Sequence, residues 1–352
     1  MVFLSHGVTA LETLRAGVDL FFVLSGFLIG RIYLRSQLDA HGQPGSFTLW
    51  GFWSARWFRT LPPYLTALAL FALLQLVFHK EAVHLRYVLF LQNYLGMDGF
   101  VPSWSLCVEE HFYLLLPMIV LVMSRKAAAW KTIALLALLV ALGLAIRSYV
   151  YFHVLLPLGR DSDEFSVRYI ERIYYPTYTR LDGLLAGVAL ALMRNFRPDW
   201  WSAILQRANW LLAGGVVLMG CTLWMFADRA SAVGTVIGFP LMAIAMGMLV
   251  MAAADRRSWF GRVRVPGARL VATLAYSLYL THKEIAHLDE LWLPKIMGAR
   301  DWKTVCVLVV SCLAAAALFY VAIERPFLAL RDRREGRVVA NLDQEARIEP
   351  AL

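Results

Sequence analysis

The chain has 352 residues, of which 60% are hydrophobic and 17% charged, and its formal net charge is +9. This apolar fraction lies well above the roughly 45–50% of globular domains, and long uncharged runs alternate with short basic loops. The pattern excludes an ordinary soluble enzyme. It also excludes a nucleic-acid-binding protein, because the basic residues are spread over many loops instead of one face. We predict an all-α fold, a polytopic transmembrane helical bundle.

Runs of about 20 apolar residues predict about nine membrane spans. Segment 83–96 is apolar but too short for a span, so we predict an interfacial or re-entrant piece there. The range 180–193 is also short, and we predict that its helix extends upstream through the tyrosine-rich stretch. In chain order, the predicted spans are 17–34, 60–78, 103–123, 132–152, 180–193, 209–226, 231–254, 270–286 and 303–322.

The lysines and arginines are concentrated in alternate loops between these spans, and the acidic run DSDE (161–164) lies in the opposite set. The positive-inside rule then places the C-terminus in the cytoplasm and accounts for the net positive charge. With nine spans, the segment MVFLSHG that begins the chain lies at the outer face.

The cysteines show no metal-ligand spacing and no paired pattern, so we predict small apolar residues within spans and neither a disulfide framework nor a metal site. They are Cys107, Cys221, Cys306 and Cys312.

Ionisable residues in or beside the spans are candidates for function, because charge within a membrane is costly. Asp19 enters a span in GVDLFFVLSGFLIG, where Ser25-Gly26 is typical of a helix-packing contact. Arg56 and Arg59, in FWSARWFRTLPPYL, lie three residues apart on one helix face and can bind phosphate or carboxylate. The competing interpretation of these arginines is simple anchoring at the cytoplasmic face.

Two more stretches carry such residues. SWSLCVEEHFYLLLP places Glu109 and Glu110 at the start of a span, where an acid also stabilises a helix N-terminus without any other role. YTRLDGLLAGVAL contains Arg180 and Asp182, which can pair with each other or with a carboxylate such as Asp19. The external, tyrosine-rich stretch around Tyr178 suits contact with carbohydrate but equally suits a membrane interface.

These stretches, taken in order from His6 to Phe327, resemble the membrane-bound acyltransferase-3 family. The resemblance rests on GVDLFFVLSGFLI, the RxxR motif followed by LPPY, WSLCVEEHFYLLLP, RLDGLLAGVALA, YSLYLTH (276–282) and IERPF (323–327). It implies transfer of an acyl group, often acetyl, from cytoplasmic acyl-CoA to a hydroxyl of an envelope glycan or a glycosylated product. It also implies a bacterial inner-membrane protein whose partners are the bilayer, acyl-CoA and a carbohydrate acceptor, with no tightly bound cofactor.

The resemblance also assigns roles. His6 matches the family's histidine and is the expected general base, since acyl transfer to an alcohol needs a group that takes the hydroxyl proton. Glu109 matches the family's glutamate, and Asp19 completes the expected catalytic set. Arg56 and Arg59 match the motif expected to contact the phosphates of CoA. Glu110, Arg180, Asp182, Tyr178 and His282 are expected to contact the acceptor or to support the site.

The family pattern has a further helix with an arginine before the histidine, so ten spans are expected for the complete pattern. Residues 1–327 are expected to form the membrane domain, and 328–352 a basic cytoplasmic tail. Two other functions stay open. One is a transporter or flippase for a lipid-linked sugar, although no internal repeat supports it. The other is a catalytically impaired, truncated homologue.

Overall fold

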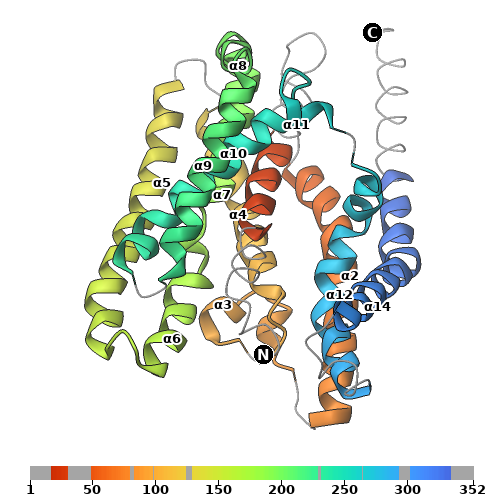
Figure 1. The fold of residues 1–352 in the computed structure, drawn as a ribbon. Coiled ribbons are helices and arrows are strands. Elements are labelled where there is room, and N and C mark those ends of the chain that lie inside the picture. The colour runs from red at the N-terminus through yellow and green to blue at the C-terminus, as the bar shows by residue number, and fades with distance from the viewer. Residues whose placement is uncertain are drawn as a thin grey trace, which may run out of the picture. The chain divides into compact units, whose positions relative to one another are not determined.

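The computed structural model describes residues 17–30, 49–79, 83–97, 99–123, 129–228, 231–263, 265–292 and 302–333 (Figure 1). The chain divides into two compact units, each of which is described by itself. The first comprises Met1–Phe47, Phe90–Gly96 and Trp104–Val263, and the second comprises Thr48–Leu89, Met97–Ser103 and Arg264–Leu352. Within the described residues the regular structure is helical, which confirms the predicted all-α fold.

In the first unit, α10 packs against α9 and α7, and α7 also contacts α5. The short helices α3 and α6 lie at one end of this unit, and α8 and α11 lie at the other (Figure 1). The elements are the helix Gly17–Gly30, α3 (Gln92–Leu95), α4 (Ser103–Met123), α5 (Ala129–Val150), α6 (Asp163–Tyr169), α7 (Asp182–Phe196), α8 (Pro198–Leu205), α9 (Ala208–Ala227), α10 (Phe239–Ala253) and α11 (Trp259–Arg262).

In the second unit, α12 (Ala268–Trp292) packs along α14 (Trp302–Phe319) and also contacts α2 (Leu49–Leu74). The buried Ser277 hydroxyl donates to Glu324 Oε2 at 2.6 Å, and the Tyr276 hydroxyl donates to the carbonyl of Thr60 at 2.8 Å. These bonds satisfy polar groups inside an otherwise apolar bundle, where an unpaired group would cost free energy.

Five helices in the described ranges are long and apolar enough to cross a membrane: Leu49–Phe78, Ile133–Leu158, Ala208–Ala227, Gly234–Ala253 and Lys303–Arg333. The other predicted spans are helical as well, in Gly17–Gly30, α4, α7 and α12. A multi-pass membrane protein is therefore confirmed. The tail predicted at 328–352 stays a prediction, since the last helix runs to Arg333 and residues 334–352 lie outside the described part.

The predicted upstream extension of 180–193 is wrong. The helix α7 begins at Asp182, and the tyrosine-rich stretch before it forms a π-helix, Ile170–Tyr174, and a 3-10 turn, Thr177–Thr179. Pro176 lies between them with an extended backbone (φ −62°, ψ 138°). Proline has no N–H to donate to a helix, so the chain breaks there.

The helix Gly17–Gly30 crosses α7 at glycine residues of both helices. A Cβ atom added to Gly26 would lie 2.2 Å from the carbonyl oxygen of Leu184, and one added to Gly187 would lie 2.2 Å from that of Val23. Small residues allow this approach between membrane helices. Asp19 and Asp182 lie on these two packed helices, within one unit.

Gly187→Ala is expected to lower the free energy of unfolding by about 1–3 kcal/mol, because the new methyl group meets backbone atoms that cannot move independently. The measurement is denaturant unfolding in detergent micelles. Gly220→Ala is the matched control, since a Cβ there meets nothing within 4 Å and alanine favours a helix. Equal costs for the two substitutions would contradict the close crossing.

Candidate active site

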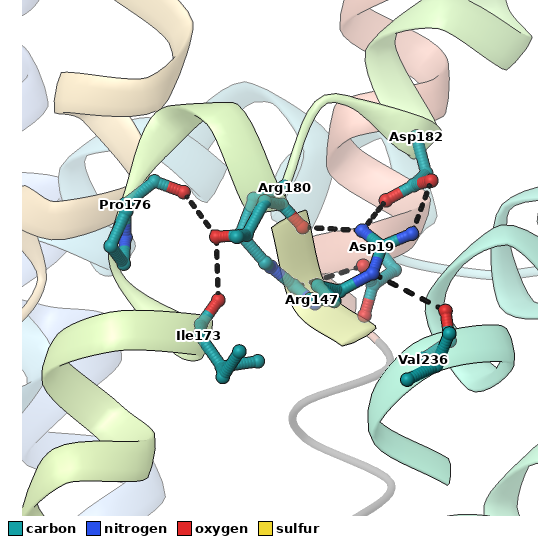
Figure 2. Close-up of polar contacts among 8 residues, drawn as sticks. Asp19, Arg147, Ile173, Pro176, Arg180, Asp182 and Val236 are labelled. Atoms are coloured by element: carbon teal, nitrogen blue, oxygen red, sulfur yellow. Dashed lines mark hydrogen bonds and ion pairs between the residues drawn. The ribbon is translucent and has the colours of Figure 1, made fainter. Parts of the chain in front are cut away.

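Two buried ion pairs form the polar centre of the first unit (Figure 2). Arg180 Nη2 lies 3.0 Å from Asp19 Oδ1. Arg147 binds Asp182 with both terminal nitrogens, at 2.6 Å to Oδ2 and 3.1 Å to Oδ1. We call these four residues the ion-pair network. All are buried, and charges inside a protein are tolerated only when they are paired in this way.

One charge of the network has a favourable position at a helix end. Asp182 is in the first turn of α7, where the helix dipole stabilises an acid. Arg147 lies within the continuous helix Ile133–Leu158, well before its last turn, and Asp19 lies in the helix Gly17–Gly30.

Each guanidinium nitrogen of Arg147 donates to a protein acceptor. Besides Asp182, its Nη1 donates to the carbonyl of Thr179 at 2.6 Å, and its Nε donates to the carbonyl of Val236 at 3.3 Å (Figure 2). One guanidinium thus joins α5 to the turn before α7 and to the π-helix Gly234–Gly238. Its role is to fix the geometry of the network.

Arg180 has a different environment. In the part of the chain that the structure describes, its Nε and Nη1 are buried without a hydrogen-bond partner. Its guanidinium carbon lies 4.1 Å from the ring centre of Phe239 and 5.0 Å from that of Tyr174. These cation–π contacts stabilise the charge but accept no hydrogen bond. Arg180 therefore has two buried donors that no described residue accepts.

The turn before α7 positions Arg180. The Thr179 hydroxyl makes short contacts to two carbonyls, Ile173 at 2.7 Å and Pro176 at 2.8 Å, which hold the 3-10 turn closed (Figure 2). The next residue, Arg180, leaves the turn with non-helical backbone angles, φ −127° and ψ 14°. Its side chain reaches Asp19 from there. A small hydroxyl residue at 179 thus supports the ion pair through the backbone.

The helix α4 contributes the predicted carboxylates, and Glu109 and Glu110 are both buried. Glu109 is one turn before Tyr113, on the same helix face. The Tyr113 hydroxyl forms a short hydrogen bond with Ser25 of the helix that carries Asp19. Glu109 is therefore on the α4 face that packs toward that helix, whereas Glu110 is on a neighbouring face.

A second polar cluster is less buried. Tyr178 stacks on Tyr94 of α3 with ring centres 6.1 Å apart, and Tyr94 stacks on His111 of α4 at 5.7 Å. We call these three residues the aromatic stack. The Nδ1 of His111 lies 2.9 Å from the Thr177 hydroxyl. Partial burial raises the pKa of the Tyr94 phenol.

The remaining predicted site residues are in the second unit or outside the described residues. Arg56 and Arg59 lie in α2, beside the stacked rings of Trp53 and Trp57. His282 lies in α12, where its Nδ1 donates to carbonyls of its own helix. His6 lies outside the described residues, and its role stays a prediction.

Sequence reasoning left one network residue out, Arg147. The available signal was a lone arginine inside the otherwise uncharged span 132–152. Of the two pairings left open for Arg180, the one with Asp19 is confirmed. Asp182 pairs with Arg147 instead. In the described residues, all four cysteines are free thiols.

With this geometry in place, comparison with known proteins is informative. The acyltransferase domain that defines acyltransferase-3 matches residues 1–324. The chain belongs to the acyltransferase-3 family. The match confirms the enzyme class predicted from the ordered motifs, and it includes both units up to Glu324.

Relatives within acyltransferase-3 include enzymes named for acetyl transfer. The chain is 29% identical over 339 residues to the peptidoglycan O-acetyltransferase OatA of Listeria monocytogenes, over 88% of this chain and 50% of that protein. It is 23% identical over 295 residues to the O-acetyltransferase OatA of Staphylococcus aureus, over 76% of this chain and 45% of that protein. The chain thus spans about half the length of the curated relatives it matches. No solved structure matches it.

Proposed function

We propose that the protein is an O-acyltransferase of the bacterial inner membrane. It moves an acyl group, here taken as acetyl, from cytoplasmic acyl-CoA to a hydroxyl of an envelope glycan. The observation that carries this proposal is the family match over residues 1–324, and relatives named for O-acetyl transfer to peptidoglycan support the choice of group and acceptor. The C-terminus lies in the cytoplasm, on the basis of the basic loops.

The reaction forms one bond and breaks another. The acceptor oxygen bonds to the acyl carbon as its proton passes to a base, and the thioester C–S bond breaks to release CoA, whose sulfur takes up a proton. His6 is the proposed base. Negative charge develops on the acyl oxygen as the bond forms, and the buried donors of Arg180 are suited to hold it. Asp19 orients Arg180, and Glu109 supports the base or the acceptor.

The donor is held by Arg56 and Arg59 at the predicted cytoplasmic end of α2, through charge-assisted bonds to the CoA phosphates. The acceptor contacts belong to the predicted outer face, so the acyl group reaches the acceptor through the membrane domain. A transporter would need no acyl donor, and therefore the test separates the two functions.

The test uses the full chain in proteoliposomes with radiolabelled acetyl-CoA outside or inside and a soluble peptidoglycan oligosaccharide as acceptor. Label in the oligosaccharide is the expected result. It should require acetyl-CoA on the side that carries the C-terminus, which is located by protease access to a C-terminal tag. Consumption of labelled acetyl-CoA without any label in the glycan would refute the proposal. So would transport of the glycan across the membrane without acetyl transfer.

Replacing both Arg56 and Arg59 by alanine is expected to raise KM for acetyl-CoA about tenfold or more with little change in kcat, because charge-assisted bonds of about 1.5–3 kcal/mol are lost from donor binding. Steady-state kinetics in detergent measures this. Arg269→Ala is the matched control, an exposed arginine of the same unit in another predicted cytoplasmic loop. An unchanged KM in the double variant would leave these arginines as anchors only.

A further inference from the structure

The aromatic stack of Tyr94, His111 and Tyr178 joins three segments that are distant in the sequence. Tyr94 is 45% exposed and Tyr178 is 37% exposed, although each is packed against another ring. Each of the two side chains combines an aromatic ring with a hydroxyl group. The stack therefore presents flat apolar surface and hydrogen-bonding groups together, which is the combination that a pyranose ring needs from a protein.

Buried hydrogen bonds of Asn93 hold the segment that carries Tyr94 in place. The helix α3, with four residues, is too short to be stable by itself. Its Asn93 is buried and donates from Nδ2 to two carbonyls, that of Trp104 at 2.9 Å and that of Tyr175 at 2.8 Å. These bonds fix α3 to the start of α4 and to the tyrosine-rich segment. The positions of Tyr94 and Tyr178 are therefore set before any ligand arrives.

The same backbone turn serves the aromatic stack and the ion-pair network. Thr177 contacts His111, Tyr178 stacks on Tyr94, and the carbonyl of Thr179 accepts from Arg147. The next residue is Arg180, which pairs with Asp19. Four consecutive residues thus lead from an exposed aromatic surface to the buried Arg180, whose Nε and Nη1 have no hydrogen-bond partner among the described residues. One short backbone segment therefore joins the aromatic stack to the ion-pair network.

We propose that the aromatic stack is the acceptor subsite, in which a sugar ring of the glycan rests on Tyr94 and Tyr178 while the turn Thr177–Arg180 aligns its hydroxyl with the site. This proposal rests on the proposed function for its choice of ligand. A membrane interface is the competing occupant of exposed tyrosines. The stack differs from a belt of single anchors because its rings come from three segments and are fixed by buried hydrogen bonds.

The chain offers a matched control in Tyr149 and His153. These residues also form a tyrosine–histidine stack, with ring centres 4.6 Å apart, and Tyr149 is 63% exposed. The two residues of this second stack are four positions apart in one stretch of helix, and among the described residues no hydrogen bond ties them to the ion-pair network. Tyr149→Ala therefore measures the effect of losing an exposed, stacked tyrosine outside the proposed subsite.

The experiment measures binding and transfer separately, with the full chain in lipid nanodiscs. Binding of chitotetraose, a soluble N-acetylglucosamine tetramer, is followed by calorimetry without any acyl donor. For Tyr178→Ala and Tyr94→Ala we expect the Kd to rise about fivefold to tenfold, as for loss of one aromatic contact. Tyr178→Phe should retain most of the binding, and Tyr149→Ala should match the wild type.

In transfer assays the same two alanine variants should raise KM for the glycan acceptor, whereas Tyr149→Ala should leave that KM unchanged. Wild-type Kd and acceptor KM in both variants would overturn the subsite, as would equal losses in Tyr149→Ala. If the wild type binds chitotetraose through Tyr94 and Tyr178 but transfers no acetyl group, the subsite stands and the proposed function fails. If it transfers acetyl normally but shows no chitotetraose binding at all, the subsite fails and the function stands.

Discussion

Arg180→Lys is expected to lower kcat by about 100-fold or more while the protein stays folded. Lysine keeps the positive charge that Asp19 needs, so the ion pair survives. It loses the planar fork, and with it the Nε and Nη1 donors that are buried without a hydrogen-bond partner in the described residues. Removing one donor to a developing oxyanion typically costs about 10²–10³ in kcat. Single-turnover acetyl transfer to the glycan measures the loss.

The controls separate this effect from general damage. Arg168→Lys makes the same change at a half-exposed arginine of the first unit, which lies near Glu164 and Glu171, and should leave kcat unchanged. The melting temperature of Arg180→Lys should stay close to that of the wild type, because the pair with Asp19 is kept. A variant that is folded and retains full kcat would show that Arg180 only supports the fold.

The predicted spans follow from the sequence alone, and the pair of Asp19 and Arg180 is among the pairings that it allows. The features that the sequence does not predict have identifiable physical reasons. Long apolar runs are a strong signal, because hydrocarbon leaves a helix few alternatives, and the predicted spans are helical. The pair of Asp19 and Arg180 was one of two open pairings, since both residues interrupt apolar stretches. Motif order then identified the family without any one motif being decisive.

The errors come from tertiary contacts. The partner of Asp182 is Arg147, 35 residues earlier in the chain, and no local spacing predicts such a contact. Arg180 was the nearer candidate along the chain, but its backbone turns before α7 begins, which points its side chain to another helix. The same turn, set by Pro176, ended the helix that hydrophobicity alone would have continued. The aromatic stack was equally hidden, because its three rings come from separate segments.

Arg147→Ala is expected to lower the free energy of unfolding by about 3–5 kcal/mol, the cost of breaking a buried ion pair from one side. The Arg147 side chain is fully buried, and its removal leaves the Asp182 carboxylate inside the protein without its cation. The carbonyls of Thr179 and Val236 lose a donor as well. Denaturant unfolding in detergent micelles measures the change.

Arg160→Ala is the matched control, since its pair with Asp228 is 3.2 Å long but 46% and 63% exposed. Exposed pairs contribute about 0–1 kcal/mol, so this variant should be close to the wild type. The double variant Arg147→Met with Asp182→Leu should recover most of the loss, because it removes both charges and keeps the volume filled. Its acetyl transfer should nevertheless fall, since the bond from Arg147 to Thr179 that fixes the turn before Arg180 is gone. Equal losses of stability in Arg147→Ala and Arg160→Ala would show that the network does not stabilise the unit. Normal acetyl transfer by the double variant would show that the network does not position Arg180.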